Sequence, residues 1–338
     1  MVNILAVAFA IFLIFGDTVK AYSAEPPFKI VIGHPVAQRV IPLLIAQEQR
    51  FFAKHGIDPL LVVFFRPGPT MIASLVSGEL QIAYINSTPV IGAVAQGTDL
   101  KILASFTADR LYFKVVARPD IKKPEELRGK RVGVTNIGAG LWMNTMLAFE
   151  QLGLDPQRDN IKILAVGDQA SLPVALEAGA IDAAIFDPGL AAQLRAKGFS
   201  IVADLSRLDV PFPGIGPTVT ATYLRTHPEV VEKLVTALVE SLAFTLSPRN
   251  KSTVLKTLMK HLRITDLAAA EESYQEIVLF NRKPYPSTKG MRSVQRLLAL
   301  QNPKVGNLKV EDIIEDRFVR KLDQSGFIDR LYATYEVK

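Results

Sequence analysis

Two stretches of similar sequence lie about 100 residues apart in this chain, and the repeat limits the folds that the chain can adopt. Three elements recur in the same order, and each contains a glycine that follows an amphipathic run. They are residues 52–59 and 149–156, residues 75–83 and 176–184, and Gly97 and Gly198, at offsets of 97, 101 and 101 residues. Solenoid repeats have periods of about 20 to 50 residues, so the longer period indicates two similar α/β lobes. The glycines are predicted to end helices in the left-handed conformation.

Strands are expected to alternate with helices through both copies of the repeat, because short β-rich runs alternate with helical apolar spacing. The predicted strands are 28–33, 60–65, 81–85 and 100–106 in the first copy, and 131–135, 162–166, 183–186 and 200–203 in the second. The predicted helices are 36–55, 70–77 and 88–96, with Thr88 as N-cap, and then 141–152, 172–178 and 190–197. This alternation predicts mixed, mostly parallel sheets with right-handed crossovers.

After the second copy the pattern becomes entirely helical. The predicted helices are 227–246, 253–262, 266–280, 288–300 and 315–325. Two β-rich links, 112–117 and 217–221, enter and leave the second copy and are predicted to be hinge strands. The expected fold is therefore α/β with two lobes, two hinge strands and a helical C-terminal extension. Lobe 1 is predicted to comprise residues 25–112 and 218–338, and lobe 2 residues 113–217.

The N-terminus has the pattern of a secretory signal peptide. Residues 4–15 are uncharged and almost entirely apolar, and 21–23 supply small residues for cleavage after Ser23, which defines a predicted signal peptide over 1–23. The first three residues carry no lysine or arginine, which leaves open a misassigned start or an uncleaved anchor. No later run reaches about 18 apolar residues, so the rest of the chain is expected to lie outside a membrane.

Composition excludes several classes of site. The chain has no cysteine, which removes disulfides, thiolate metal sites, cysteine nucleophiles and a lipidated cysteine anchor. Its four histidines, 34, 55, 227 and 261, lie far apart in sequence, so no metal site and no cofactor is expected. The net charge is +6, but the basic residues are scattered rather than interleaved with aromatics on one face. We therefore expect no nucleic-acid binding.

Polar loops follow the predicted strands in both copies, and these loops are the candidate ligand site. In open α/β sheets, ligands bind beyond the carboxyl ends of the strands. The candidates in the first copy are His34, Gln38, Arg66, Thr70, Asn86, Ser87, Thr88 and Ser105. The candidates in the second copy are Asn136, Gly138, Ala139, Gly140, Trp142, Asp168 and Asp187. Each loop taken alone is more often a capped turn than a ligand site, and only together do the loops indicate one site.

The loop from Asn136 to Gly140 is the most specific of these signals. It follows a strand and opens a helix, where backbone N–H groups and the helix dipole favour an anion. A plain glycine turn is the alternative, and the third glycine of a dinucleotide fingerprint is absent. Trp142 either walls the cleft or packs in the core. Arg66 or Arg39 could supply a cation to the same anion.

Several segments together resemble the solute-binding proteins of nitrate, sulfonate and taurine ABC importers, an SsuA/THI5-like group that includes binders of thiamine-pyrimidine precursors. The segments are 51–58, 75–80, 97–101, 126–134 and 175–183, and the resemblance spans roughly residues 28–245. Gln81 stands where the family commonly has aspartate, as this chain has at Asp182.

The resemblance implies a type II periplasmic-binding fold and a role in transport rather than catalysis. A monomeric periplasmic protein would close two lobes on a small organic anion, a sulfonate or carboxylate, and deliver it to a membrane permease with its ATPase. The alternatives are a binder of a neutral pyrimidine, an exported sensory protein, and an enzyme on the same scaffold, including a cytosolic one if the N-terminus is misread. Related desulfinases use a catalytic cysteine, which this chain lacks.

Overall fold

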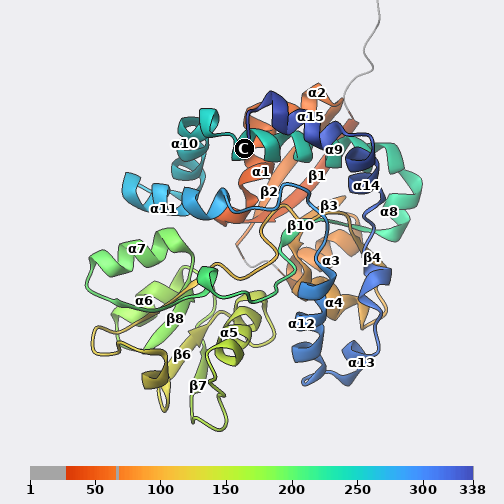
Figure 1. Ribbon diagram of the computed structural model, residues 1–338. Helices are drawn as coiled ribbons and strands as arrows, with labels where there is room; N and C mark the ends of the chain where they lie inside the picture. Colours follow the sequence, from red (N-terminus) through yellow and green to blue (C-terminus); the bar gives the residue numbers. More distant parts are fainter. Residues whose placement is uncertain (1–27, 66–67, 338) are drawn as a thin grey trace, which may run out of the picture.

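The computed structural model describes residues 28–65 and 68–337, and in this part of the chain two five-stranded sheets lie side by side (Figure 1). The signal-peptide prediction lies outside the described residues. The first sheet has the order β2 (Ile57–Phe64), β1 (Phe28–Pro35), β3 (Ile82–Asn86), β10 (Ile215–Thr220) and β4 (Leu100–Ile102). The second has the order β7 (Lys162–Ala165), β6 (Arg131–Val134), β8 (Ala183–Phe186), β5 (Lys114–Ala117) and β9 (Ser200–Asp204). The sequence repeat is thus a repeat of strand order.

Each sheet combines parallel and antiparallel pairing in the same way. β1 pairs in parallel with β2 and β3, as β6 does with β7 and β8. The fourth strand of each order, β10 or β5, runs antiparallel to both of its neighbours. These two strands come from the links that were predicted to be hinges, so each link completes a sheet instead of spanning the gap between sheets.

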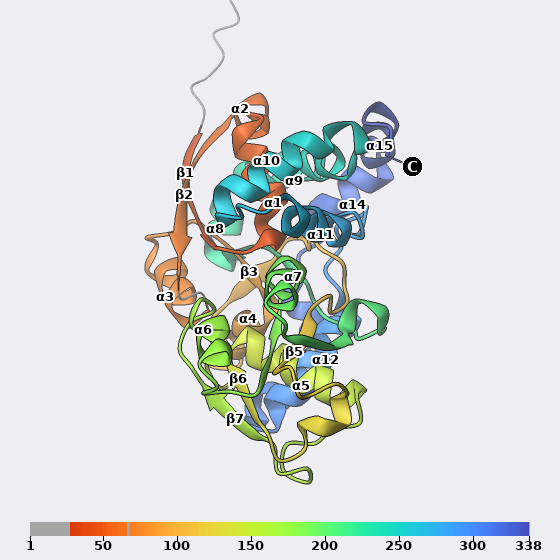
Figure 2. The same cartoon turned by 90° about the vertical axis from the view of Figure 1, so that its left-hand side faces the viewer.

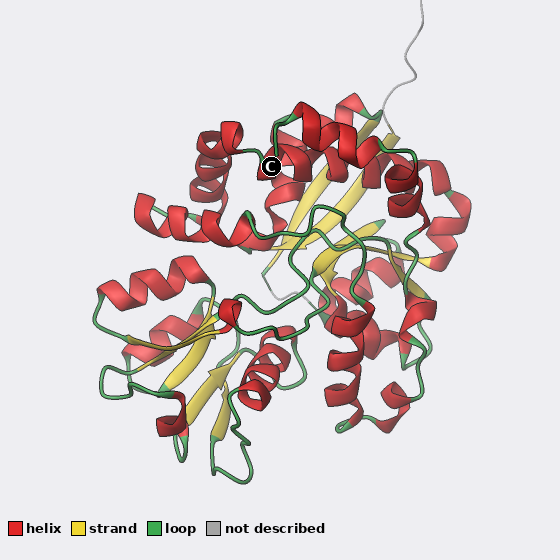
Figure 3. Cartoon of the chain, viewed as in Figure 1, coloured by secondary structure: helices red, strands yellow, loops and turns green. Residues whose placement is uncertain are grey.

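The chain crosses between the sheets just before each of those strands, along residues 103–113 and 205–214; apart from the short 3-10 turn at Leu205–Arg207, both crossings appear as long green loops in Figure 3. The two crossings are hydrogen-bonded together. Leu111 N donates to Val210 O at 3.0 Å, and Phe212 N donates to Asp109 O at 2.9 Å. The predicted hinge positions, 112–117 and 217–221, are therefore a few residues late, because β-rich composition marks a strand and not the crossing before it.

The helices between the strands match the predicted ones closely. They are α1 (Ile41–Glu48), α2 (Phe51–Lys54), α3 (Pro69–Ser77), α4 (Ser87–Val94), α5 (Gly140–Gln151), α6 (Ser171–Glu177) and α7 (Pro188–Ala196). The single helix predicted over 36–55 is divided, because Arg50 adopts a left-handed φ of 59° between α1 and α2. The N-cap of α4 is Asn86 and not Thr88, since the Asn86 side chain accepts from the Thr88 N–H.

The repeated glycines adopt the left-handed backbone that the sequence predicts. Their φ values are 75° and 70° for Gly56 and Gly153, 85° and 70° for Gly78 and Gly179, and 95° and 94° for Gly97 and Gly198. An L-residue with a Cβ is strained in this conformation, which explains why glycine recurs at these helix ends.

Gln81 and Asp182 make the same hydrogen bond in the two sheets. Val31 N donates to Gln81 Oε1 at 2.7 Å, and Arg131 N donates to Asp182 Oδ2 at 2.9 Å. Both acceptors tie the segment before β3 or β8 to the neighbouring parallel strand, β1 or β6. Glutamine in place of aspartate therefore preserves the contact.

The helical C-terminal part packs on the first sheet and reaches the second. Its helices are α8 (Ala221–Thr226), α9 (Pro228–Leu246), α10 (Lys251–Leu262), α11 (Leu267–Ile277), α12 (Thr288–Ala299), α13 (Pro303–Gly306), α14 (Arg317–Gln324) and α15 (Phe327–Thr334). Short 3-10 turns cover Gln38–Val40 (η1), Pro124–Leu127 (η2), Leu205–Arg207 (η3), Pro248–Asn250 (η4) and Val310–Ile313 (η5). Helix α9 buries its apolar face against α1. Across the described residues, we find no helix with the length and apolarity that a membrane crossing requires.

Two of these helices bridge to the second lobe on different sides. Helix α11 lies over α7, as Figure 2 shows, and a Cβ on Gly189 would clash with Ser273 of α11. Helix α12 contacts α5, where Arg296 pairs with Glu150 at 2.7 Å. The C-terminal extension thus holds the second lobe against the first.

Substituting the repeated glycines tests their conformational role. Gly97→Ala and Gly198→Ala should each lower the free energy of unfolding by about 1–2 kcal/mol, because only the left-handed backbone opposes the new Cβ. Nothing lies within 4 Å of that Cβ at either position. Gly92→Ala is the matched control inside α4, where the Cβ also meets nothing and alanine should stabilise by up to about 1 kcal/mol. Urea unfolding of the three variants decides; equal effects at Gly92 and Gly97 would contradict the assignment.

Candidate functional site

The carboxyl ends of four strands converge between the lobes. Arg39 follows β1 in η1, and Asn86 ends β3 in the neighbouring position of the first sheet. Gly140 opens α5 after β6, and Asp187 follows β8 in the neighbouring position of the second sheet. Ligands in open α/β sheets bind at this end of the strands. These four residues therefore mark the centre of the candidate site.

Asn86 and Gly140 bring the two lobes into contact. A Cβ built on Gly140 would lie 2.7 Å from Asn86 Nδ2, so this approach requires glycine. The N-cap position of α5 is Ala139, whose side chain makes no cap. The first turn of α5 therefore brings its positive dipole end and backbone N–H groups to the place where the two lobes meet.

Arg39 is a buried cation that forms no ion pair with any residue in the described part of the chain. Its side chain is 5% exposed, and the guanidinium carbon lies 4.0 Å from the ring centroid of Tyr112 and 5.4 Å from that of Phe212. Nε and Nη2 are buried, and no hydrogen-bond partner for them exists in residues 28–65 and 68–337. Burial lowers the pKa of Arg39, and nearby Tyr112, Asp187 and Glu276 oppose that shift. A guanidinium stays protonated in proteins, so these N–H groups call for an anionic partner.

Asp187 connects the second lobe to Arg39 through Tyr112. The Tyr112 hydroxyl donates to Asp187 Oδ1 at 2.7 Å, and Gln169 Nε2 donates to Oδ2 at 2.8 Å. Asp187 stands at the N-cap of α7 but caps nothing with its side chain, whereas Asn86 caps α4 from the matching position. Burial raises the pKa of Asp187, while Tyr112, Arg39 and Gln169 act in the opposite direction.

Several other predicted residues lie buried near the same edge of the first sheet. Gln38 Nε2, Thr88 Oγ1 and Ser105 Oγ are buried and, among the described residues, have no hydrogen-bond partner. They follow β1, β3 and β4, whose carboxyl ends or flanking loops face the second lobe. Ser87 is buried beside Thr88 in the first turn of α4. His34 is buried at the end of β1, and burial lowers its pKa.

The remaining predicted residues have roles within their own loops. Thr70 is exposed in α3, and Asn136 is exposed with its Nδ2 donating to Gly167 O at 3.2 Å. Gly138 has a φ of 79°, and Asp168 accepts from the Ser171 N–H and hydroxyl.

The predictions for Trp142 and Arg66 as site residues differ in what the structure says about them. Trp142 is 8% exposed and packs in a hydrophobic core cluster, which favours the core interpretation over a cleft wall. Arg66 lies outside the described residues.

Some buried polar groups were not predicted from the sequence. Tyr112 was interpreted only as the start of a hinge strand, and Asn144 only as part of a helix, although its buried Oδ1 has no hydrogen-bond partner among the described residues. Glu276, on α11, has a buried Oε2 without a partner in the described structure. A polar residue inside an otherwise apolar helical face is the one sequence signal that could have identified Asn144 and Glu276.

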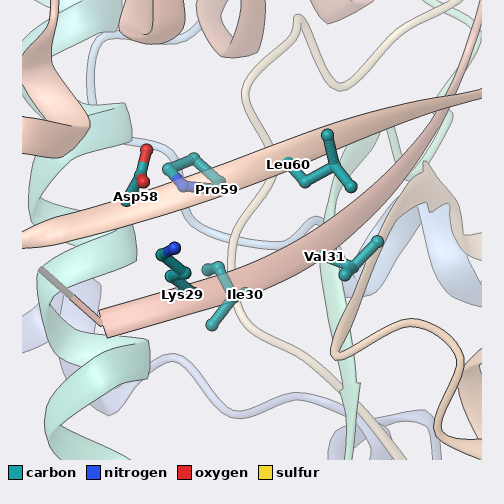
Figure 4. A pocket seen from close by; sticks show the side chains of 6 residues that line it. All are labelled: Lys29, Ile30, Val31, Asp58, Pro59 and Leu60. Carbon is teal, nitrogen blue, oxygen red and sulfur yellow. The ribbon is translucent and has the colours of Figure 1, made fainter.

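Two surface hollows lie away from these residues. One is lined by Lys29, Ile30, Val31, Asp58, Pro59 and Leu60 (Figure 4). It lies toward the amino ends of β1 and β2, opposite the end that carries Gln38 and Arg39. The other lies between α3 and α8. Within the described ranges, no three His, Asp or Glu side chains gather as a metal site would require.

Two lobes of matching topology, each built on a mixed five-stranded sheet, have the fold of the periplasmic binding proteins. The chain belongs to the NMT1/THI5-like family, which it matches over residues 37–251. It is 24% identical over 202 residues to the taurine-binding periplasmic protein of Escherichia coli, covering 59% of this chain and 62% of that protein. It is 26% identical over 229 residues to a putative aliphatic sulfonates-binding protein of Bacillus subtilis, covering 65% and 67%. The first alignment thus spans less than two thirds of the relative.

Solved structures share the fold at lower identity. The periplasmic aliphatic sulphonate binding protein SsuA of Escherichia coli superposes with a TM-score of 0.69 at 19% identity, covering 86% of this chain and 92% of SsuA. The desulfurization enzyme DSZB has the same fold, with a TM-score of 0.61 at 16% identity over 88% and 99% of the two chains. The fold alone therefore supports both binding and catalysis.

Glu276 provides a pH test of the interface between α11 and the second lobe. Burial raises its pKa to about 7, reinforced by Asp204 and opposed by Lys114 and Arg110. The folded state therefore binds this proton more tightly than the unfolded state, and stability should fall as pH rises from 4.5 toward 7. Across this pH range the free energy of unfolding should decrease by about 3 kcal/mol in total.

Glu276→Gln should remove this loss of stability. The free energy of unfolding of the variant, relative to that of the wild type, should therefore increase between pH 5 and pH 8. Urea unfolding at both pH values measures it, with exposed Glu125→Gln as the control. A difference between wild type and Glu276→Gln that does not change with pH would contradict the assignment.

Proposed function

We propose that this protein is the exported, periplasmic solute-binding component of an ABC importer, whose lobes close on a small organic anion such as a sulfonate or carboxylate. The observation that carries the proposal is Arg39, a buried guanidinium between the lobes with two unpartnered nitrogen atoms in the described structure. Its cleft neighbours Gln38, Thr88 and Ser105 add unpartnered donors. The similarity to taurine- and sulfonate-binding proteins agrees with such a ligand.

The chemistry of the cleft suits an oxyanion. The planar guanidinium offers paired N–H donors that match two oxygens of a sulfonate or carboxylate. The uncapped first turn of α5 adds a positive dipole end from the second lobe. Because one contribution comes from each lobe, an anion between them favours the closed arrangement. The protein then acts as a monomer that delivers the anion to a membrane permease with its ATPase.

A neutral pyrimidine is the second candidate ligand, since the family description includes THI5-like proteins. Such a ligand would leave the charge of Arg39 unpaired in a buried site, which costs several kcal/mol. Catalysis is the third candidate, because DSZB shares the fold. The chain has no cysteine to act as a nucleophile, and we infer a binding protein and not an enzyme.

Ligand binding by purified protein tests the proposal directly. Ethanesulfonate, propionate, nitrate and a neutral aminopyrimidine are compared by thermal shift and then by calorimetry. We expect the organic anions to raise the melting temperature and the pyrimidine to have no effect. If only the pyrimidine raised the melting temperature, the proposal that the ligand is an anion would be overturned.

Arg39→Met tests the residue that carries the proposal. Loss of charge-assisted hydrogen bonds should weaken anion binding by about 100-fold or more. Arg282→Met is the matched control, because Arg282 also stacks on a tyrosine, at 4.3 Å from the Tyr332 ring centroid. Calorimetry should give the control the wild-type Kd. An unchanged Kd for Arg39→Met would remove Arg39 from the site.

A further inference from the structure

Tyr112 contacts Arg39, the candidate anion-binding residue of the first lobe, and Asp187, a carboxylate of the second lobe. Its ring lies under the Arg39 guanidinium at 4.0 Å, and its hydroxyl donates to Asp187 at 2.7 Å. From this geometry we propose that Tyr112 is a positioning residue, which orients Arg39 toward the bound anion. The affinity of the protein for that anion then depends on Asp187 in the opposite lobe. The inference rests on the proposed function.

The aromatic surroundings restrict the movement of the guanidinium. Tyr112, Phe113 and Phe212 all belong to or adjoin the two crossing segments, and their ring centroids lie 4.0, 5.6 and 5.4 Å from the guanidinium carbon of Arg39. A guanidinium that packs among three rings has little freedom to move, because arginine is attracted to aromatic faces. Its Nε and Nη2, which have no hydrogen-bond partner in the described structure, are the atoms that an oxyanion would meet.

The hydroxyl links this stack to the second lobe. Asp187 does not cap α7 and uses both carboxylate oxygens for Tyr112 and Gln169. Its counterpart Asn86 caps α4, so the repeat is broken at this position in favour of the bond to Tyr112. A phenol that donates to a carboxylate has a more electron-rich ring, which strengthens its attraction for the cation above it.

The relative position of the two lobes therefore affects the anion site through one side chain, that of Tyr112. Tyr112 lies two residues before β5 of the second sheet, while Arg39 follows β1 of the first. Separation of the lobes would separate the Tyr112–Asp187 pair from Arg39. Anion binding and apposition of the lobes are consequently coupled through the Arg39–Tyr112 contact.

A second arginine–tyrosine pair, Arg282 and Tyr332, supplies the control, since neither residue contacts Arg39, Tyr112 or Asp187 through an interaction of the described residues. Tyr332 is buried in α15, its ring lies 4.3 Å from the Arg282 guanidinium carbon, and its hydroxyl donates to the Arg282 carbonyl at 2.6 Å. Tyr332→Phe and Tyr112→Phe each remove one buried hydroxyl and keep the ring. Both variants should lose thermal stability, but only Tyr112→Phe should lose affinity.

The experiment measures the Kd of ethanesulfonate by calorimetry and the ligand-induced decrease in radius of gyration by X-ray scattering. We expect Tyr112→Phe to weaken binding at least about tenfold and to reduce the compaction, while Tyr332→Phe changes the Kd less than about twofold. Asp187→Asn, which keeps the shape of the acceptor, should also weaken binding and decides the matter if Tyr112→Phe does not fold.

The outcomes separate the two proposals. If wild-type protein binds ethanesulfonate and both Tyr112→Phe and Asp187→Asn retain its Kd and compaction, the positioning role is overturned and the anion-binding function stands. If wild-type protein binds none of the organic anions, the proposed function fails and the positioning role fails with it. Equal loss of affinity in Tyr332→Phe would show a general stability effect and would also overturn the positioning role.

Discussion

The Arg39 guanidinium stacks on Tyr112 in the interior of the molecule, and no carboxylate of the described structure forms an ion pair with it. Burying an unpaired cation costs several kcal/mol, so the surrounding structure must hold it in place. The first sheet supplies Arg39 after β1, the crossings supply the aromatic rings, and the second sheet supplies Asp187 behind Tyr112. This one charge therefore links both lobes and the connection between them.

The repeat explains how two lobes build such a site. Both copies fold into the same strand order, and the paired glycines, with Gln81 and Asp182, stabilise equivalent turns. The copies differ at the carboxyl ends of their strands. Asn86 caps its helix and rests on Gly140, whereas Asp187 turns to Tyr112. The shared residues maintain the fold, and the residues that differ make the contacts between the lobes and the crossing segments.

Local sequence signals were sufficient for the fold, and they identified several of the buried polar residues that lie where the lobes meet. Left-handed glycines, helix starts and strand runs depend on neighbours in sequence, and the elements lie within a few residues of their predicted positions. The stack of Arg39 on Tyr112 and the burial of Glu276 against the second lobe depend on segments that meet only in the folded chain. Trp142 illustrates the limit, because its helical position fitted both a core and a cleft, and packing favours the core.

A crystal structure of the protein with 2-bromoethanesulfonate tests the central claim most directly, since the anomalous signal of bromine locates the ligand without bias. The account predicts one sulfonate between the lobes, with its oxygens within hydrogen-bond distance of the Arg39 guanidinium and close to the first turn of α5. A sulfonate bound elsewhere, with Arg39 still unpaired on Tyr112, would contradict it.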